Sequence, residues 1–241
     1  MLGGLLRAVT GAPAGPAPGG GGGGAEEAVR GLYDACSALP GEPGTDVPPA
    51  AASAVSAALC AVRAEHLGFS EGSSHGTQVG YAHIHSEEAF SVGVFTMEKG
   101  ARLPLHDHPG MTVYSRLLYG DLHVRAYDWA GDEEREAAGG EARLVRDEVV
   151  KGPALLELRP GSMGNIHEFR AVSSCAILDV LTPPYAIGNG RDCTYFEREG
   201  GASGGGEGSA AGEGAVRLRA VPCPPDFFTR SVPYSGPRLG R

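Results

Sequence analysis

The sequence predicts a mainly β protein in which short antiparallel strands form a sandwich or barrel, with helices packed outside it. From about Tyr81 onward, apolar residues recur with a period of two, which is typical of strands with one buried face. Short turn sequences, such as YGD at 119–121 and RPG at 159–161, separate the candidate strands. Before Tyr81 the apolar residues recur at helical spacing instead.

Two helices are predicted ahead of the strands. Residues 25–38 carry acidic residues in their first turn, and apolar residues then follow at helical spacing: Val29, Leu32, Tyr33 and Cys36. The alanine-rich residues 50–65 form the second helix, with one apolar face made by Val55, Ala58, Leu59 and Val62. Neither helix carries a cluster of titratable groups suited to catalysis, so we expect both to pack against the outside of the sheet.

The strands follow in order, and each is predicted from its alternating pattern and the turn that ends it. A charged loop is expected at 132–140, and residues 215–221 are expected to add a last strand after a glycine-rich stretch. The other predicted strands are 80–86, 90–97, 102–106, 111–118, 121–128, 142–147, 154–158, 165–171 and 175–181.

Two segments have a composition that does not favour a packed fold. Residues 1–24 are rich in glycine and proline and are predicted to be a disordered tail. An organelle transit peptide is the alternative, favoured by the lack of acidic residues but opposed by the scarcity of arginine and serine. Residues 199–214 are a low-complexity insertion that we expect to be mobile. The sequence therefore predicts one folded domain over residues 25–238.

Composition excludes several classes of partner. The formal net charge of −9 argues against nucleic acid or an anionic membrane. No apolar run approaches the ~20 residues that a membrane-spanning helix needs. The 5 cysteines are odd in number and share no CxxC spacing, so neither a disulfide scaffold nor a structural zinc site is expected. A reducing compartment, the cytoplasm or the nucleus, is the prediction.

The chemistry is expected at three histidines. His106 and His108 stand two residues apart in an alternating run, and residues i and i+2 of a strand point to the same face, about 6–7 Å apart. His167 lies 59 residues further on, within GSMGNIHEF. If the intervening strands fold back beside the first, three neutral nitrogens meet and leave other coordination positions free. An open site of this kind is what a catalytic metal needs.

Other candidate residues are interpreted as structural. His83 and His85 repeat the same spacing, but they lack the flanking glycine and proline residues. His123 stands alone in a strand, where a histidine is usually a core or surface residue. Asp107, between the two ligand candidates, should point to the opposite face and is not expected to be a ligand. Cys175 lies in an apolar strand and is expected to be inert core.

The spacing around the histidine pair resembles the first sequence motif of the cupins. Its fixed positions are Gly100, His106, His108, Val113 and Gly120, and many cupins carry a glutamate ligand where Val113 stands. The second motif is half present, because GNIH at 164–167 keeps the glycine and the histidine while a serine, at 162, replaces the usual proline. The resemblance implies a single-domain cupin, an antiparallel double-stranded β-helix or jelly-roll barrel, with three histidine ligands and no carboxylate.

Longer stretches resemble one enzyme family. They are LPLHDHPGMTVYSRLLYGDLHVRAYDW, CAILDVLTPPY, GRDCTYF and a C-terminal PYSGP. These sequences are similar to the thiol dioxygenases that include plant cysteine oxidases and animal cysteamine dioxygenase, over roughly residues 28–235. TVYSRLLYG and HVRAYDW look more like the plant branch. Family members hold non-haem iron through three histidines and add both atoms of O₂ to a thiol sulfur, giving a sulfinic acid.

The resemblance implies Fe(II) as cofactor, O₂ as co-substrate, and His106, His108 and His167 as the ligands. Neutral ligands leave the metal its full positive charge, which favours a bound thiolate. Asp179 and Tyr185 match two residues near the substrate. We expect Asp179 to orient the substrate amine, directly or through water, and Tyr185 to donate a hydrogen bond near the oxygen site.

Two further residues are carried over from the family. Cys193 and Tyr195 match a pair that becomes covalently crosslinked in the animal enzyme, and both are included as candidate catalytic residues. The 199–214 insertion follows this pair closely and, if ordered near it, would alter access to the site.

The resemblance also implies a substrate class. Plant members oxidise the N-terminal cysteine of proteins, which marks those proteins for arginylation and degradation, so that O₂ sets their lifetime. In flowering plants the targets are group VII ethylene-response transcription factors. Two alternatives stay open: a dioxygenase for small thiols such as cysteamine or free cysteine, and a non-catalytic metal-binding cupin. We expect a monomer.

Overall fold

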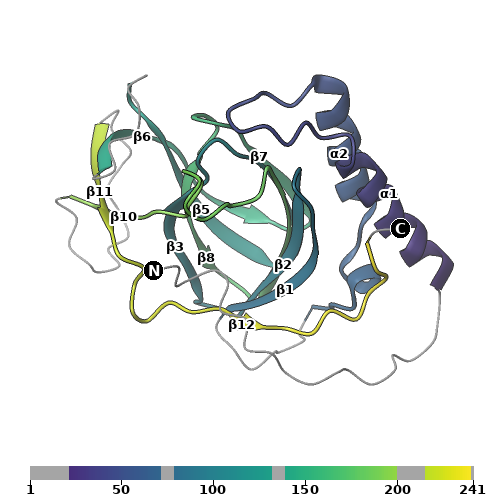
Figure 1. Cartoon of the computed structure of the whole chain (residues 1–241). Helices are drawn as coiled ribbons and strands as arrows, with labels where there is room; N and C mark the ends of the chain where they lie inside the picture. The colour runs from purple at the N-terminus through teal and green to yellow at the C-terminus, as the bar shows by residue number, and fades with distance from the viewer. Residues whose placement is uncertain (1–21, 72–78, 132–138, 200–214, 240–241) are drawn as a thin grey trace.

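A computed structural model describes residues 22–71, 79–131, 139–199 and 215–239, and places a β-barrel beside a pair of helices (Figure 1). The helices are α1 (Gly22–Cys36), α2 (Pro49–Ala61) and a short 3₁₀ helix (Ala64–Leu67). None of the helices within these residues is long and apolar enough to cross a membrane. The strands are β1 (Val79–Ser86), β2 (Ser91–Met97), β3 (Arg102–Asp107), β4 (Thr112–Tyr119), β5 (Asp121–Trp129), β6 (Gly139–Lys151), β7 (Ala154–Leu158), β8 (Ile166–Ala171), β9 (Cys175–Thr182), β10 (Tyr195–Arg198), β11 (Ala215–Val221) and β12 (Arg230–Ser231).

The strands form two sheets that together make the barrel. The first sheet has the order β12-β1-β2-β9-β4-β7, and the second has the order β10-β11-β6-β5-β8-β3 and closes through a β10–β3 pair. All pairs are antiparallel except β12 with β1. This is the predicted mainly β, double-stranded β-helix, with strands distant in sequence such as β3 and β8 lying side by side.

Every predicted strand is present, and most bounds agree within one residue. β6 extends three or more residues beyond both ends of the predicted 142–147, so 139 and 140 of the expected loop belong to a strand. The rest of that loop, at 132–138, lies outside the described residues. β10 and β12 were not predicted, because segments of 4 and 2 residues are too short to show a period.

The helical segments match the predictions less closely at their ends. α1 begins at Gly22, within the stretch predicted as tail, and residues 1–21 lie outside the described part of the chain. The second predicted helix ends at Ala61 because Val62 is extended, and a separate 3₁₀ turn follows. The 199–214 insertion lies outside the description except for its first residue. The domain bounds therefore stay a prediction.

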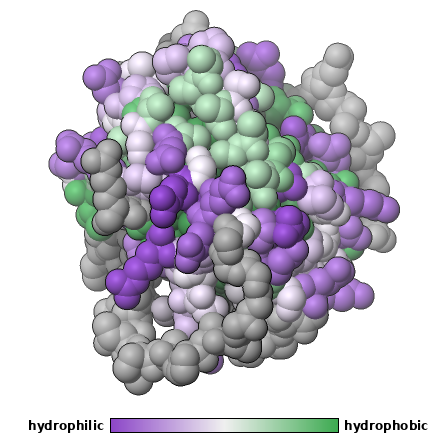
Figure 2. All heavy atoms as spheres, turned by 90° about the vertical axis from the view of Figure 1, so that its right-hand side faces the viewer, coloured by the Kyte–Doolittle hydropathy of each residue, from purple (hydrophilic) through white to green (hydrophobic). Residues whose placement is uncertain are grey.

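The helices cover the outer face of the first sheet, as expected. Buried apolar residues of both helices pack against the outward side chains of β2, β4 and β9. The helix residues include Leu32, Val55 and Leu59, and the strand residues include Val92, Val94, Tyr114, Leu178 and Val180. Burying one such side chain stabilises the fold by roughly 1.5–3 kcal/mol. Figure 2 faces this side of the molecule and shows a continuous hydrophobic area in its upper half. The helices thus complete the core and leave the barrel interior free for a site.

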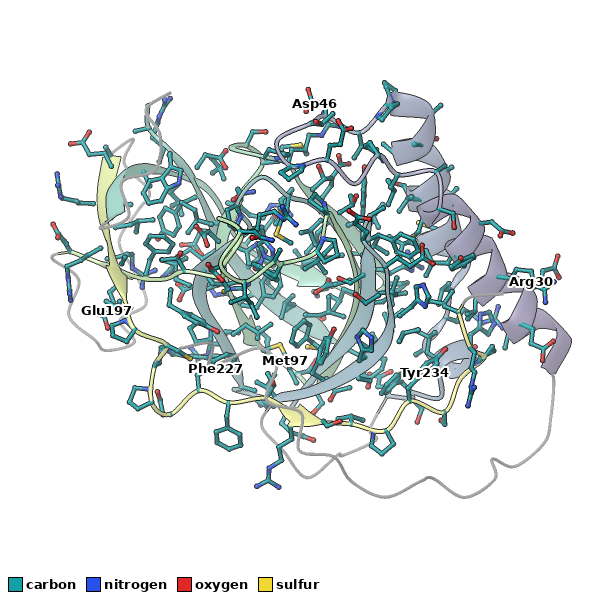
Figure 3. The ribbon with its side chains drawn as sticks, in the orientation of Figure 1. Arg30, Asp46, Met97, Glu197, Phe227 and Tyr234 are labelled. Atoms are coloured by element: carbon teal, nitrogen blue, oxygen red, sulfur yellow. The ribbon has the colours of Figure 1, made fainter. Side chains whose placement is uncertain are left out.

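The barrel interior is apolar at one end. Phe95, Leu103, Leu117, Phe169 and Ile177 belong to one buried cluster there. The C-terminal segment runs across this end to β12, and Phe227 packs against the cluster from it (Figure 3). The histidines lie next to this cluster, and Phe95, Leu103 and Phe169 line the same cavity as they do.

Candidate metal centre

Strand pairing brings the three predicted histidines together. His106 on β3 pairs directly with His167 on β8, and His108 comes directly after β3, two residues beyond His106. The three rings lie 4.8 to 4.9 Å apart between centroids, and all three side chains are buried. Their ligand nitrogens lie within 4.8 Å of one another, and within the described residues this is the group suited to hold a metal ion.

The hydrogen bonds of the rings fix which nitrogen faces the centre. The Nδ1 of His106 lies 2.8 Å from the carbonyl oxygen of Pro104, which can only accept, so Nδ1 carries the proton and Nε2 is free. The Nε2 atoms of His108 and His167 are 3.4 Å apart. Two nitrogen–metal bonds of about 2.1 Å span that distance. The residues therefore fit a metal ion bound by three imidazoles.

The electrostatics of the cluster keep the imidazoles neutral. Burial lowers the pKa of His106. Burial lowers the pKa of His108 and of His167 well below the usual range; His106 adds to the effect on both, and His167 adds to the effect on His108. A metal ligand has to be deprotonated, so a site that already disfavours the imidazolium form releases no proton on binding.

Tyr185 lies behind His108. Its hydroxyl donates to the carbonyl oxygen of Asp107 at 2.7 Å and is 2.8 Å from Nδ1 of His108. Because the only hydroxyl proton goes to the carbonyl, the tyrosine oxygen accepts from Nδ1–H, which leaves Nε2 of His108 for a metal. The expected donation from Tyr185 to bound oxygen would require the hydrogen bond to Asp107 to break.

Asn165 joins the two ligand-bearing segments, and the sequence analysis missed it. Its Nδ2 donates to the carbonyl oxygens of His108 and Arg159, each at 3.0 Å, and its Oδ1 accepts from the backbone N–H of His108 at 3.3 Å. The turn that carries it is held by Asp128, whose Oδ1 accepts from the N–H groups of Gly164 and Asn165. Its place in GNIH, beside a ligand candidate, was the available signal.

A cavity opens beside the histidines. Asp179, on β9, lines it and is 8% exposed, with no hydrogen-bond partner for Oδ1 among the described residues. Burial raises the pKa of Asp179 to about 7, and the hydroxyl of Ser115, directly opposite on β4, opposes this shift. Apolar side chains form most of the remaining lining: Phe95, Leu103, Val113, Phe169 and Leu181.

Val113 and Phe169 define the apolar side of the centre. Val113 occupies the position at which many cupins have a carboxylate ligand, and it lines the cavity as an apolar wall. Phe169 stacks on His167, with centroids 4.4 Å apart and ring planes 15° apart. The donor set is therefore three neutral nitrogens, and Asp179 is the acidic residue on the cavity wall.

Cys193 and Tyr195 are not among the residues that line this cavity. Tyr195 pairs with His106 through the β10–β3 bridge, with ring centroids 6.3 Å apart. Two hydrogen bonds to Asp107 hold the segment. The N–H of Thr194 donates to Oδ1 of Asp107 at 2.9 Å, and the N–H of Asp107 donates to the carbonyl oxygen of Thr194 at 3.2 Å. The side chain of Asp107 thus turns toward Thr194 and away from the metal position, as predicted. Burial raises the pKa of Cys193 to about 12.

The histidines interpreted as structural lie outside the cluster. His85 bonds to Glu87 at 2.8 Å, and His123 bonds to Asp147 at 2.6 Å on the outer face of the barrel. His83 is exposed, and Cys175 is buried in the apolar core.

The fold defines the chain as a cupin, and its three histidines form a group of neutral nitrogens suited to hold a metal ion. The family profile PCO_ADO matches residues 52–239, and the chain belongs to that family. Plant cysteine oxidase 1 of Arabidopsis thaliana is 44% identical over 118 residues, 48% of this chain and 40% of that protein. The 2-aminoethanethiol dioxygenase of Mus musculus is 34% identical over 187 residues, 67% of this chain and 71% of that protein.

The matched region spans less than half the length of the plant relative. Among solved structures, an RmlC-like cupin protein from Desulfovibrio desulfuricans is 20% identical with a TM-score of 0.32, covering 48% of this chain and 96% of that one.

Proposed function

We propose that this protein is a non-haem iron thiol dioxygenase that uses O₂ to oxidise the N-terminal cysteine of target proteins to cysteine sulfinic acid. The observation that carries the proposal is the convergence of three neutral imidazoles, from His106, His108 and His167, on one point beside a cavity that holds a buried carboxyl, Asp179. Membership of the PCO_ADO family supports the reaction class. Both oxygen atoms go to the substrate sulfur, so RSH and O₂ give RSO₂H.

The chain supplies the ligand set and its orientation. Iron(II) bound here would offer a cationic position that favours the thiolate form of the substrate and accommodates O₂. His106 is oriented through the carbonyl of Pro104, and His108 through Tyr185. Because no carboxylate joins the three histidines, a metal bound here would retain its charge, which would favour binding of a thiolate.

Asp179 is proposed to bind the α-ammonium group of the substrate. Its Oδ1 is buried and has no partner in the described chain, which costs free energy that a cationic ligand would recover. The ammonium would also stabilise the ionised carboxylate, whose pKa burial raises to about 7. An N-terminal cysteine carries a thiol and an ammonium two carbons apart, so one residue satisfies both the metal and Asp179.

The role in the cell is part of the same proposal. Oxidation of an exposed N-terminal cysteine would mark the target for degradation, so the enzyme would act as an oxygen sensor in the cytoplasm or nucleus. Partners are therefore proteins or peptides that begin with cysteine, with group VII ethylene-response factors as the candidates if the source is a flowering plant.

The test is anaerobic loading with Fe(II), then exposure to O₂ with a peptide beginning Cys-Gly, followed by mass spectrometry. The expected product is heavier by two oxygen atoms, about 32 Da, and His167→Ala abolishes it. Oxidation of cysteamine without oxidation of the peptide would assign the protein to the small-thiol class. Iron binding without oxidation of either would leave a metal-binding cupin.

A further inference from the structure

A second thiol lies opposite Cys193. β10 and β11 pair in antiparallel fashion with Tyr195 directly opposite Val221. The pairing ends there, and an extension of its register by two residues on each segment would set Cys193 opposite Cys223, on the same face as Tyr195; the two thiols are close enough for Cys223 to influence the pKa of Cys193. Opposed residues of an antiparallel pair have Cα atoms about 4.5–5.5 Å apart, within the range of about 4.4–6.8 Å that disulfides require.

The hydroxyl of Tyr195 marks the same juxtaposition independently. It is buried and makes no hydrogen bond of normal geometry within the described chain. It lies beside the thiols of both Cys193 and Cys223, and burial together with these two neighbours raises the pKa of Tyr195 well above its usual value. One hydroxyl group therefore lies near both thiols, and both cysteines are reduced in the structure.

The backbone holds Cys223 in this position. Pro222 and Pro224 flank it and restrict its backbone, and its thiol lies 3.7 Å from the carbonyl oxygen of Pro224. The next turn closes with a hydrogen bond of 3.1 Å from the N–H of Phe227 to Pro224. The Phe227 ring contacts Tyr195, with centroids 6.1 Å apart, and packs into the barrel end (Figure 3).

We propose that Cys193 and Cys223 are a modification site at which hydrogen peroxide forms a reversible disulfide beside the metal centre. Both S–H bonds and the O–O bond of the peroxide break, one S–S bond forms, and two molecules of water are released. The thiols lose two electrons and the peroxide gains them. Because burial raises the pKa of Cys193 to about 12, little thiolate is present, so the reaction is slow and needs excess peroxide.

The site is coupled to the metal through neighbouring residues. The thiol of Cys193 contacts the hydroxyl of Tyr185, which accepts the Nδ1–H of His108. Thr194, the next residue in the chain, is hydrogen-bonded to Asp107, which stands between His106 and His108 in the sequence. Drawing the Cys193 sulfur toward Cys223 would disturb both contacts, so we expect the disulfide to weaken metal retention.

The experiment uses the full chain loaded with Zn(II), which binds imidazole without redox chemistry of its own. The protein is exposed to excess hydrogen peroxide, its remaining thiols are alkylated, and it is digested with trypsin without reductant. The expected product is peptide 192–198 joined to peptide 220–230, two hydrogens lighter than their sum and separated by dithiothreitol. The matched variants are Cys223→Ser, which should remove the joined pair, and Cys60→Ser, which should retain it because Cys60 is exposed at the end of α2.

The outcomes separate the possibilities. A joined pair that dithiothreitol does not release, or a loss of two hydrogens within peptide 192–198 alone, would overturn the proposal in favour of a bond to Tyr195. Full alkylation of both cysteines, or oxidation of each to a separate acid, would also overturn it. Zinc transfer to a chromophoric chelator should become several-fold faster after oxidation, and an unchanged rate would refute the coupling while the disulfide stands. None of these readouts depends on dioxygenase activity.

Discussion

Removal of one hydroxyl group tests whether Tyr185 orients a metal ligand. In Tyr185→Phe, the Nδ1–H of His108 loses its acceptor and the carbonyl of Asp107 loses its donor, at distances of 2.8 and 2.7 Å in the native protein. A hydrogen bond contributes about 0.5–1.5 kcal/mol net, so the two together contribute about 1–3 kcal/mol. At about 1.4 kcal/mol for each factor of ten, this predicts metal binding weaker by roughly 10- to 100-fold, the range typical of residues behind a ligand.

The assay is an anaerobic competition titration of Fe(II), repeated with Zn(II), against a chromophoric chelator. The matched control is Tyr234→Phe, because Tyr234 is also partly buried and donates at 2.7 Å to a carbonyl, that of Pro237, in the C-terminal segment beside the helices (Figure 3). The control should bind metal like the native protein. If Tyr185→Phe binds both metals within twofold of the native affinity, the assignment of the Nδ1 proton and of the role of Tyr185 is refuted.

Three further predictions concern two other residues. Asp179→Asn should lower turnover of a Cys-Gly peptide at least tenfold at unchanged iron content, measured by mass spectrometry and metal analysis; equal turnover would remove Asp179 from substrate binding. The pKa of Asp179 rises from 3.8 to about 7 on folding, so between these pH values the native protein binds one proton more than the unfolded chain. The contribution of protonated Asp179 to stability is therefore present at low pH and is lost as the pH rises through 7. Between pH 5 and pH 8 the urea midpoint of the native apoprotein should therefore fall relative to that of Asp179→Asn. A constant difference between the two midpoints would contradict the burial argument. Asn165→Ala should lower both the urea midpoint of the apoprotein and the zinc affinity, since three hydrogen bonds are lost, whereas a loss confined to the midpoint would make Asn165 merely structural.

The sequence by itself determined the local elements and the ligand candidates. The recurrence of apolar residues with a period of two is a property of adjacent residues, so most strands were predicted within a residue or so, although β2 and β4 are buried along nearly their whole length. The pair His106 and His108 was predicted to share a face for the same reason, and GNIH at 164–167 supplied the third ligand candidate. The family resemblance supplied what spacing does not contain, namely iron, O₂ and the substrate class.

Only the tertiary structure decided how the centre is supported. Tyr185 approaches His108 from 77 residues away, and Asn165 joins His108 across 57. The segments that carry Cys193 and Cys223 come together because β11 pairs with β10, a strand too short to be predicted from its pattern. These contacts depend on which strands become neighbours when the barrel closes. Pairing between distant strands is set by burial of the whole core, so no local pattern of residues records it.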